Sequence, residues 1–218
     1  MPRTIYLLGD SHVNMLDSEK AGHFDGDFFF KFVMGASFTA YSLGTHEEEI
    51  LAALSKVDNS NWIIMIYGEI DCRYRIFYHH EVDGIPIDET VENTVCNYFK
   101  FIQCLQSLGY KICVSSIMPT MRVGCPWAGD PLQTLEHGHG GPDEDRRYIT
   151  EIFNAKLKHS CWELEIPYLN LYPHLVDPID GLTRLDMAYS ERDPMHYGYI
   201  GDIATKVIKE TLGDVLCK

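Results

Sequence analysis

The chain has 218 residues, of which 45% are hydrophobic, so it can bury one substantial core without a second domain. Eighteen basic residues stand against 32 acidic ones, and a net charge of −14 argues against nucleic acid or an anionic membrane surface as a partner. No apolar segment approaches membrane-spanning length, and no leader pattern precedes the first apolar run, which predicts a cytoplasmic protein. We expect one domain over residues 1–218. The sequence does not indicate an oligomeric state.

Five short apolar runs have the character of buried β-strands. They lie at residues 4–9, 28–35, 62–68, 110–119 and 166–173. Their near-continuous hydrophobicity is typical of strands that are covered on both faces, as strands of a parallel sheet are. The sequence therefore predicts about five parallel strands.

Longer amphipathic segments separate these runs and predict helices. They cover residues 46–57, 88–108, 143–164 and 196–212. Strands that alternate with helices indicate a three-layer α/β/α sandwich. Two irregular stretches, residues 118–145 and 173–193, are long for a compact domain, and loops of this length are usually functional or disordered.

The seven cysteines do not form a disulfide framework by their pattern. Their number is odd, no CxxC pair is present, and several fall within apolar periodic segments, at positions 72, 96, 104, 113, 125, 161 and 217. We therefore expect reduced thiols, most of them packed in the core.

A serine directly follows the first predicted strand, in the motif "GDSH". Ligands of open parallel sheets bind beyond the carboxyl ends of the strands, so Ser11 stands where a site is expected. If a helix starts just after it, the local amides and the helix dipole favour negative charge near its oxygen. The alternative is that Asp10 and Ser11 simply cap this helix.

A second polar motif, "DPMH", precedes the last predicted helix. Asp193 lies three residues before His196, and Pro194 suits the first residue of a helix, so we expect Asp193 to be the N-cap. From one helical turn, the carboxylate could hold one imidazole nitrogen while the other faces a nucleophile. A capping aspartate followed by a surface histidine is the alternative.

At these residues the sequence resembles the SGNH, or GDSL-type, serine hydrolases. "GDSH" supplies Ser11, "MGASFTAYSLG" offers Gly35, "YGEIDCR" occupies the third block of the family, and "DPMH" supplies Asp193 and His196. The resemblance implies a flavodoxin-like sheet with strand order 2-1-3-4-5 and a Ser-His-Asp triad. It also implies an oxyanion hole that includes the amides of Ser11 and Gly35, with no cofactor and no metal.

The third block departs from the family pattern "GxND". Ile70 occupies the position of the asparagine, and an apolar side chain cannot donate a hydrogen bond to an oxyanion. Loss of one such donor costs about 3 kcal/mol in a characterised serine protease. Arg73 could replace the donor, or the two amides could suffice, and the block resembles a subgroup with "GEIDCR". Equally, Glu69, Asp71 and Arg73 could form a structural ion-pair cluster.

Two further side chains are candidates for the walls of the site. His12 follows the serine and either lines the site or packs beside it. Trp127 lies among glycines and a proline in the long loop and could form a wall for a sugar or an acyl group.

The same loop contains a histidine pair that could bind a divalent metal. His137 and His139 lie near Asp143 and Glu144. Glycine-rich acidic loops of this kind are more often solvated, so we expect no metal.

These observations predict an O-acyl esterase that acts on a small-molecule or glycan ester, with a short acyl group such as acetyl. The alternatives are an O-acyltransferase that uses the same triad and, because of Ile70, a catalytically weakened fold that binds a glycan or a protein.

Overall fold

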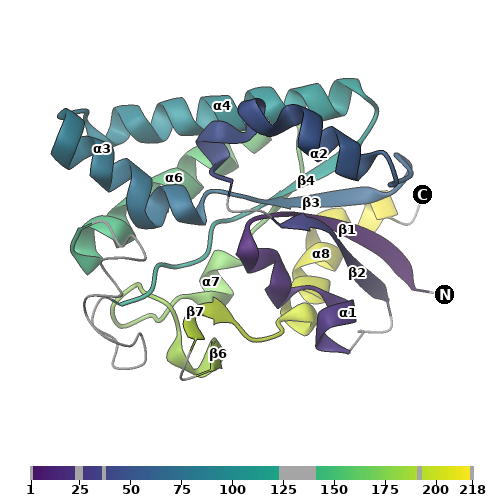
Figure 1. Cartoon of the computed structure of the whole chain (residues 1–218). Helices are drawn as coiled ribbons and strands as arrows, with labels where there is room; N and C mark the ends of the chain where they lie inside the picture. The colour runs from purple at the N-terminus through teal and green to yellow at the C-terminus, as the bar shows by residue number, and fades with distance from the viewer. Residues whose placement is uncertain (1, 23–26, 36–37, 123–140, 191–192, 217–218) are drawn as a thin grey trace.

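The computed structural model describes residues 2–22, 27–35, 38–122, 141–190 and 193–216, and its centre is a parallel β-sheet (Figure 1). Five strands pair in the order β2-β1-β3-β4-β5, and all four pairings are parallel. This confirms the predicted fold class and strand order. The strands are β1 (Arg3–Gly9), β2 (Phe28–Gly35), β3 (Trp62–Ile66), β4 (Lys111–Ser115) and β5 (Tyr168–Leu169).

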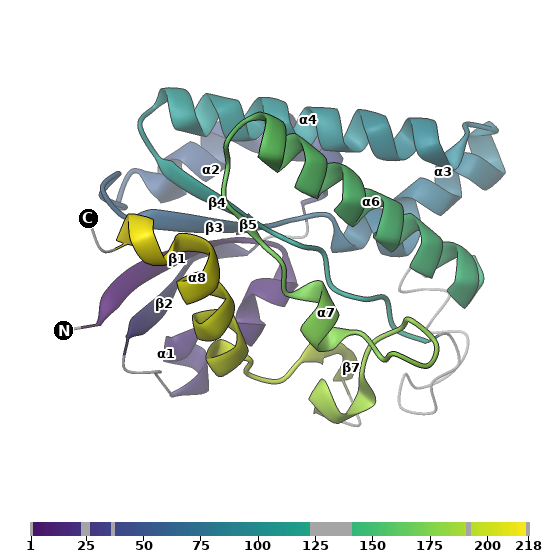
Figure 2. The same cartoon turned by 180° about the vertical axis from the view of Figure 1, so that it is seen from behind.

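Helices cover both faces of the sheet and complete the three layers (Figures 1 and 2). One face carries α2 (Glu47–Leu54), α4 (Ile87–Ser107) and α6 (Asp143–Glu163). The opposite face carries α1 (Ser18–Ala21), α7 (Tyr172–Leu175) and α8 (Gly201–Leu216). The helices α4 and α6 match their predicted ranges to within two residues at each end.

Alternate residues of the central strands belong to two separate cores. Leu8 and Met65 pack with the side chains of α2, α4 and α6. Leu7 and Ile64 pack with those of α8. Because successive side chains of a strand point to opposite faces, this division explains why the strands are apolar along their whole length.

Short helices connect the main elements, and only the one after Ser11 was considered from the sequence. They are η1 (Ser11–Met15), η2 (Ala40–His46), η3 (Asp71–Arg75), α3 (Ile76–Asp83) and η4 (Leu185–Met187). In Figure 1, η3 and α3 lead from the end of β3 to the start of α4. These segments are too short to show a clear helical period in the sequence.

The start of the last helix was predicted wrongly. Residues Asp193–Tyr197 form strand β7, which pairs antiparallel with β6 (Ala188–Ser190), and α8 begins only at Gly201. Asp193 is therefore not the N-cap of α8, and the argument that a helical turn pairs Asp193 with His196 does not apply. The long-range contacts that fix β7, described below, outweigh the local helix-start pattern.

Two simpler predictions also have an outcome within the described residues. The described cysteines are all free thiols, as expected: Cys72, Cys96, Cys104, Cys113 and Cys161. Among the helices that the structure describes, none is both long and apolar enough to cross a membrane.

The close contact between β1 and β3 at Gly9 leaves no room for a side chain. A Cβ atom at this position would lie 2.3 Å from the Ile66 carbonyl oxygen and 2.5 Å from Val13 Cγ1. We expect Gly9→Ala to lower the free energy of unfolding by about 1 to 3 kcal/mol, because the backbone must move to admit the methyl group. Urea denaturation measures this change.

Gly44→Ala is the matched control, since a Cβ atom there meets nothing within 4 Å. We expect this variant to be as stable as the wild type or slightly more stable. Equal stability of both alanine variants would contradict the packing argument.

Candidate functional site

The carboxyl ends of three neighbouring strands meet at one point of the sheet. Gly9 at the end of β1 pairs in register with Gly35 of β2 on one side and with Ile66 of β3 on the other. The amide of Asp10 continues this contact and donates to the Ile66 carbonyl oxygen at 3.1 Å. The first three sequence motifs therefore converge at the edge where parallel sheets bind ligands.

Ser11 opens the 3₁₀ helix η1 directly after β1, and its side chain is exposed. Asp10 is the N-cap of η1, and its Oδ1 accepts a hydrogen bond from the amide of His12 at 2.9 Å. The capping alternative is thus correct for Asp10. It does not compete with a functional role of Ser11, because the cap fixes the turn that presents the serine.

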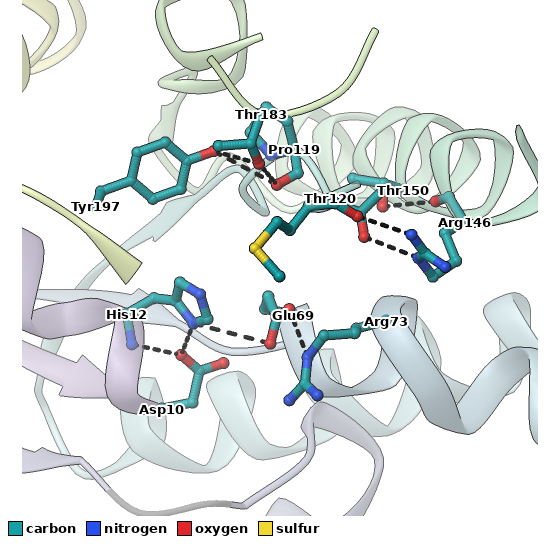
Figure 3. A network of polar contacts seen from close by, with 11 residues as sticks. Asp10, His12, Glu69, Arg73, Pro119, Thr120, Arg146, Thr150, Thr183 and Tyr197 are labelled. Atoms are coloured by element: carbon teal, nitrogen blue, oxygen red, sulfur yellow. Dashed lines mark hydrogen bonds and ion pairs between the residues drawn. The ribbon is translucent and has the colours of Figure 1, made fainter. Parts of the chain in front are cut away.

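His12 is buried between two carboxylates (Figure 3). Its Nδ1 lies 3.0 Å from Asp10 Oδ1 and 3.8 Å from Glu69 Oε2. An ionised carboxylate can only accept, so opposite an ionised Asp10 the Nδ1–H of His12 is the donor of this hydrogen bond. Of the two roles considered for His12, packing beside the serine turn is the one that these contacts support.

The third block forms an ion pair next to this histidine. Arg73 Nε donates to Glu69 Oε1 at 2.8 Å, and both side chains are largely buried. Figure 3 shows the chain of contacts from Asp10 through His12 and Glu69 to Arg73. The structural ion pair that the sequence allowed is present, and it joins Arg73 to Glu69.

Asp71 belongs to a separate contact on the other side of the same turn. Its side chain is fully buried, Oδ2 accepts from the amide of Ala40 at 2.6 Å, and Oδ1 lies 3.6 Å from Arg75 Nη1. Burial raises the pKa of Asp71 to about 7, against the opposing effects of the Ala40 amide and the Arg75 charge. Asp71 therefore contacts η2, which follows Gly35 in the chain, and not Arg73.

Strand β7, which carries Asp193 and His196, lies beside η1, which carries Ser11. The amide of Ile200, just beyond β7, donates to the Met15 carbonyl oxygen at 2.9 Å. At the end of β7, the buried hydroxyl of Tyr197 lies 3.1 Å from Thr183 Oγ1 and 3.4 Å from the Pro119 carbonyl oxygen (Figure 3). The structure thus brings the fourth motif next to the first at the level of these elements.

A fully buried arginine lies on the opposite side of the site from His12 (Figure 3). Arg146 donates to Thr120 Oγ1 at 3.2 Å, to the carbonyl oxygens of Met121 and Gly141 at 2.7 and 2.6 Å, and to Asp143 Oδ1 at 2.5 Å. Burial lowers its pKa, while the charge of Asp143 opposes this effect. This arginine joins the segment after β4 to the start of α6.

Three predicted residues of the long loop, Trp127, His137 and His139, lie outside the described residues. Asp143, which was considered as a metal ligand with them, accepts from Arg146 instead. In the part of the chain that the structure describes, no group of three or more histidine, cysteine or acidic side chains could hold a metal ion.

Sequence reasoning missed three residues that shape the site. Arg75 had a usable signal, because it lies four residues after Asp71 on a helical turn. Arg146 had a partial signal, because Asp143 lies three residues before it in the predicted helix, but its contacts with Thr120 and Met121 come from a distant part of the chain. Tyr197 had none, because its partners Thr183 and Pro119 lie 14 and 78 residues away.

Solved structures with the same architecture match almost the whole chain. A GDSL-like lipase from Bacteroides thetaiotaomicron has 12% identity and a TM-score of 0.59, with 98% of this chain and 87% of that chain covered. A catalytic mutant of Axe2, an acetylxylan esterase from Geobacillus stearothermophilus, has 10% identity and a TM-score of 0.56, with 98% and 96% covered. The acetyl xylan esterase AlAXEase has 16% identity and a TM-score of 0.53, with 95% and 98% covered.

No family model matches the sequence, and no curated protein matches it. The chain has the fold of the SGNH, or GDSL-type, hydrolases, which confirms at the level of the fold the resemblance seen in the sequence.

The Tyr197 hydroxyl anchors β7 and can be removed without a change of shape. We expect Tyr197→Phe to lower the free energy of unfolding by about 1 kcal/mol, since Thr183 Oγ1 loses a buried partner. Chemical denaturation of this variant, of Thr183→Val and of the double variant measures the coupling between the two side chains. Additive effects would contradict a direct interaction.

Tyr110→Phe is a control for the loss of a tyrosine hydrogen bond far from β7, because the Tyr110 hydroxyl donates to the Leu54 carbonyl oxygen at 3.1 Å. We expect this variant to leave the coupling energy between Tyr197 and Thr183 unchanged.

Proposed function

We propose that this protein is a serine esterase that cleaves a short O-acyl ester, on a small molecule or on a carbohydrate. One observation carries the proposal: the exposed Ser11 opens the turn after the first strand of a GDSL-type hydrolase fold, and the strand with Asp193 and His196 lies beside this turn. Solved proteins of this fold include acetylxylan esterases, which supports a glycan ester as the substrate class. The free thiols fit the cytoplasmic location proposed with this activity.

In the proposed reaction, Ser11 Oγ attacks the ester carbonyl while His196 accepts the hydroxyl proton. A serine hydroxyl is a weak nucleophile at neutral pH, so it needs this base. Asp193 holds the tautomer of His196 and stabilises the imidazolium. His196 then gives the proton to the leaving alcohol, and water releases the acyl group from Ser11 by the same steps. A second alcohol in place of water would make the protein an acyltransferase.

The oxyanion is proposed to accept hydrogen bonds from the amides of Ser11 and Gly35. These positions are supported by the register, which pairs Gly9 directly with Gly35. Arg73 is proposed as the third donor in place of the family asparagine, since Ile70 cannot serve. Glu69 binds Arg73 through Nε, and this contact would orient the guanidinium.

Replacement of the nucleophile tests the proposed function. Ser11→Ala should abolish hydrolysis of p-nitrophenyl acetate without unfolding the chain, because an exposed hydroxyl contributes little to stability. A fluorophosphonate probe should label the wild type at Ser11 and should not label the variant. Circular dichroism and thermal melting show whether the variant is folded.

Full activity of folded Ser11→Ala would refute the proposal of a serine esterase with Ser11 as its nucleophile. A wild-type protein that neither hydrolyses esters nor reacts with the probe, yet binds acetylated glycans, would favour the weakened binding protein.

Arg73 is tested by the separation of kcat from KM. If its guanidinium stabilises the oxyanion, Arg73→Ala should lower kcat about a hundredfold and change KM much less, because charge develops only in the transition state. Arg73→Lys should restore part of kcat, since an ammonium group cannot reproduce the planar fork. Steady-state kinetics after active-site titration measures both constants.

If Arg73 only stabilises the turn through Glu69, the result differs. Arg73→Ala would then reduce the amount of active enzyme and the melting temperature, while kcat per titrated site stays near that of the wild type. This outcome would leave the two amides as the proposed oxyanion donors.

A further inference from the structure

The connection between β2 and η2 is fixed at both ends. Gly35 pairs with Gly9 at the edge of the sheet, and the amide of Ala40 donates to Asp71 Oδ2 at 2.6 Å. Only residues 36–39 lie between these two points. Asp71 therefore holds the start of η2, five residues after Gly35, against the turn that follows β3.

Asp71 also completes the N-terminal cap of η2. Thr39 is the N-cap residue, and its Oγ1 accepts from the amide of Ser42 at 3.2 Å in a capping box. The amides of Ala40 and Tyr41, which precede Ser42, donate to the Asp71 carboxylate. Two different side chains thus satisfy the first three amides of η2, which otherwise have no partner within the helix.

The charge of this buried carboxylate depends on one cation. Arg75 Nη1 lies 3.6 Å from Asp71 Oδ1, and the Arg75 guanidinium is held 3.6 Å from the centre of the Tyr41 ring. Just after β1, the negative charge of Asp10 opposes ionisation of Asp71. On η3 itself, the adjacent Cys72 has a raised pKa because of burial and the charge of Asp71, so it adds no second negative charge at neutral pH.

The contacts of Asp71 suit the ionised form alone. Oδ2 faces amide donors and Oδ1 faces the Arg75 guanidinium. A proton on Oδ1 would point at a cation, and a proton on Oδ2 would displace an amide. Protonation therefore either displaces an amide of η2 from Oδ2 or weakens the contact of Oδ1 with Arg75.

We propose that ionised Asp71 is a positioning residue of the acyl-transfer site, which holds the start of η2 in place close after Gly35, and that Arg75 supplies its countercharge. This inference rests on the proposed function, because it assigns Asp71 to the support of the Gly35 amide. Asp71 and Arg75 touch no reacting atom in this account.

The ionised form is obtained at a cost in folding free energy. Burial raises the pKa of Asp71 to about 7, above the value of about 3.9 for an unfolded chain, so folding takes up a proton between these two values. Because the folded protein binds this proton more tightly than the unfolded chain, the proton stabilises the fold. This contribution to the free energy of unfolding is full below about pH 4 and is lost as the pH rises through about 7. The contacts to η2 gain strength over the same range, so activity should rise with pH while this part of the stability falls.

Asp71→Asn tests the charge with almost no change of shape. We expect kcat for p-nitrophenyl acetate to fall about tenfold or more, with KM changed less than about twofold. The reason is that a displaced Gly35 amide weakens the stabilisation of the transition state more than the binding of the substrate. The matched control is Asp58→Asn, because exposed Asp58 also accepts a hydrogen bond from a backbone amide, that of Ser60 at 2.8 Å, and lies before the start of β3, whereas the site lies beyond its end. This control should retain the kcat of the wild type.

The amide signals of Ala40 and Tyr41 in ¹⁵N NMR spectra give a measurement that needs no enzymatic activity. In the wild type, both signals should shift with a midpoint near pH 7. Arg75→Met should move this midpoint to higher pH, because it removes the countercharge, and Arg75→Lys should keep it near the wild-type value. The lower limb of the pH profile of kcat should move in the same direction in Arg75→Met.

The proposal is overturned if the Ala40 amide shows no titration between about pH 5 and pH 9 in the wild type, or if Arg75→Met leaves its midpoint unchanged. Full kcat in folded Asp71→Asn overturns it as well. If Asp71→Asn does not fold, the wild-type and Arg75 spectra decide. A protein without esterase activity but with the expected NMR titration would refute the proposed function and leave the Asp71 contact to η2 intact.

Discussion

The contact at Gly9 is the constraint on which the rest of the site depends. Because this residue has no side chain, β1 and β3 end against each other, and the amide of Asp10 reaches the Ile66 carbonyl oxygen. The serine turn that follows β1 is thereby held beside the turn that follows β3. A larger residue would separate the two turns, and the contacts from Asp10 through His12 to Glu69 span only a few ångströms.

Those two turns bury several charges in a chain whose net charge is −14. Three carboxylates are largely or fully buried there: Asp10, Glu69 and Asp71. Isolated buried carboxylates would be very costly, so each needs a nearby donor or cation. Two of these carboxylates pair with an arginine four residues further along the chain. Glu69 pairs with Arg73 inside the motif "GEIDCR", and Asp71 pairs with Arg75, two residues after the motif. The motif therefore builds a charge-compensated turn, whatever further role Arg73 has.

The sequence was sufficient to predict the strands of the sheet and the long helices that pack on one of its faces. The apolar runs located all five strands, although β5 is much shorter than its run, and the long amphipathic periods located α4 and α6. The Asp10 cap and the Glu69 to Arg73 pair were also accessible, because these contacts join residues close in sequence. The resemblance to GDSL-type hydrolases, and not the periodicity, supplied the strand order. Side-chain positions for Asp193 and His196 remain predictions.

The error at the last helix has a different physical origin. Aspartate and proline before an amphipathic run form a valid start signal, but the contacts that decide the conformation of β7 come from distant parts of the chain. The Tyr197 hydroxyl reaches Thr183 and the Pro119 carbonyl oxygen, and the Ile200 amide reaches the Met15 carbonyl oxygen at the end of the serine helix. No local window contains these partners. Since Met15 belongs to η1 itself, the strand with His196 and the turn with Ser11 stabilise each other's positions.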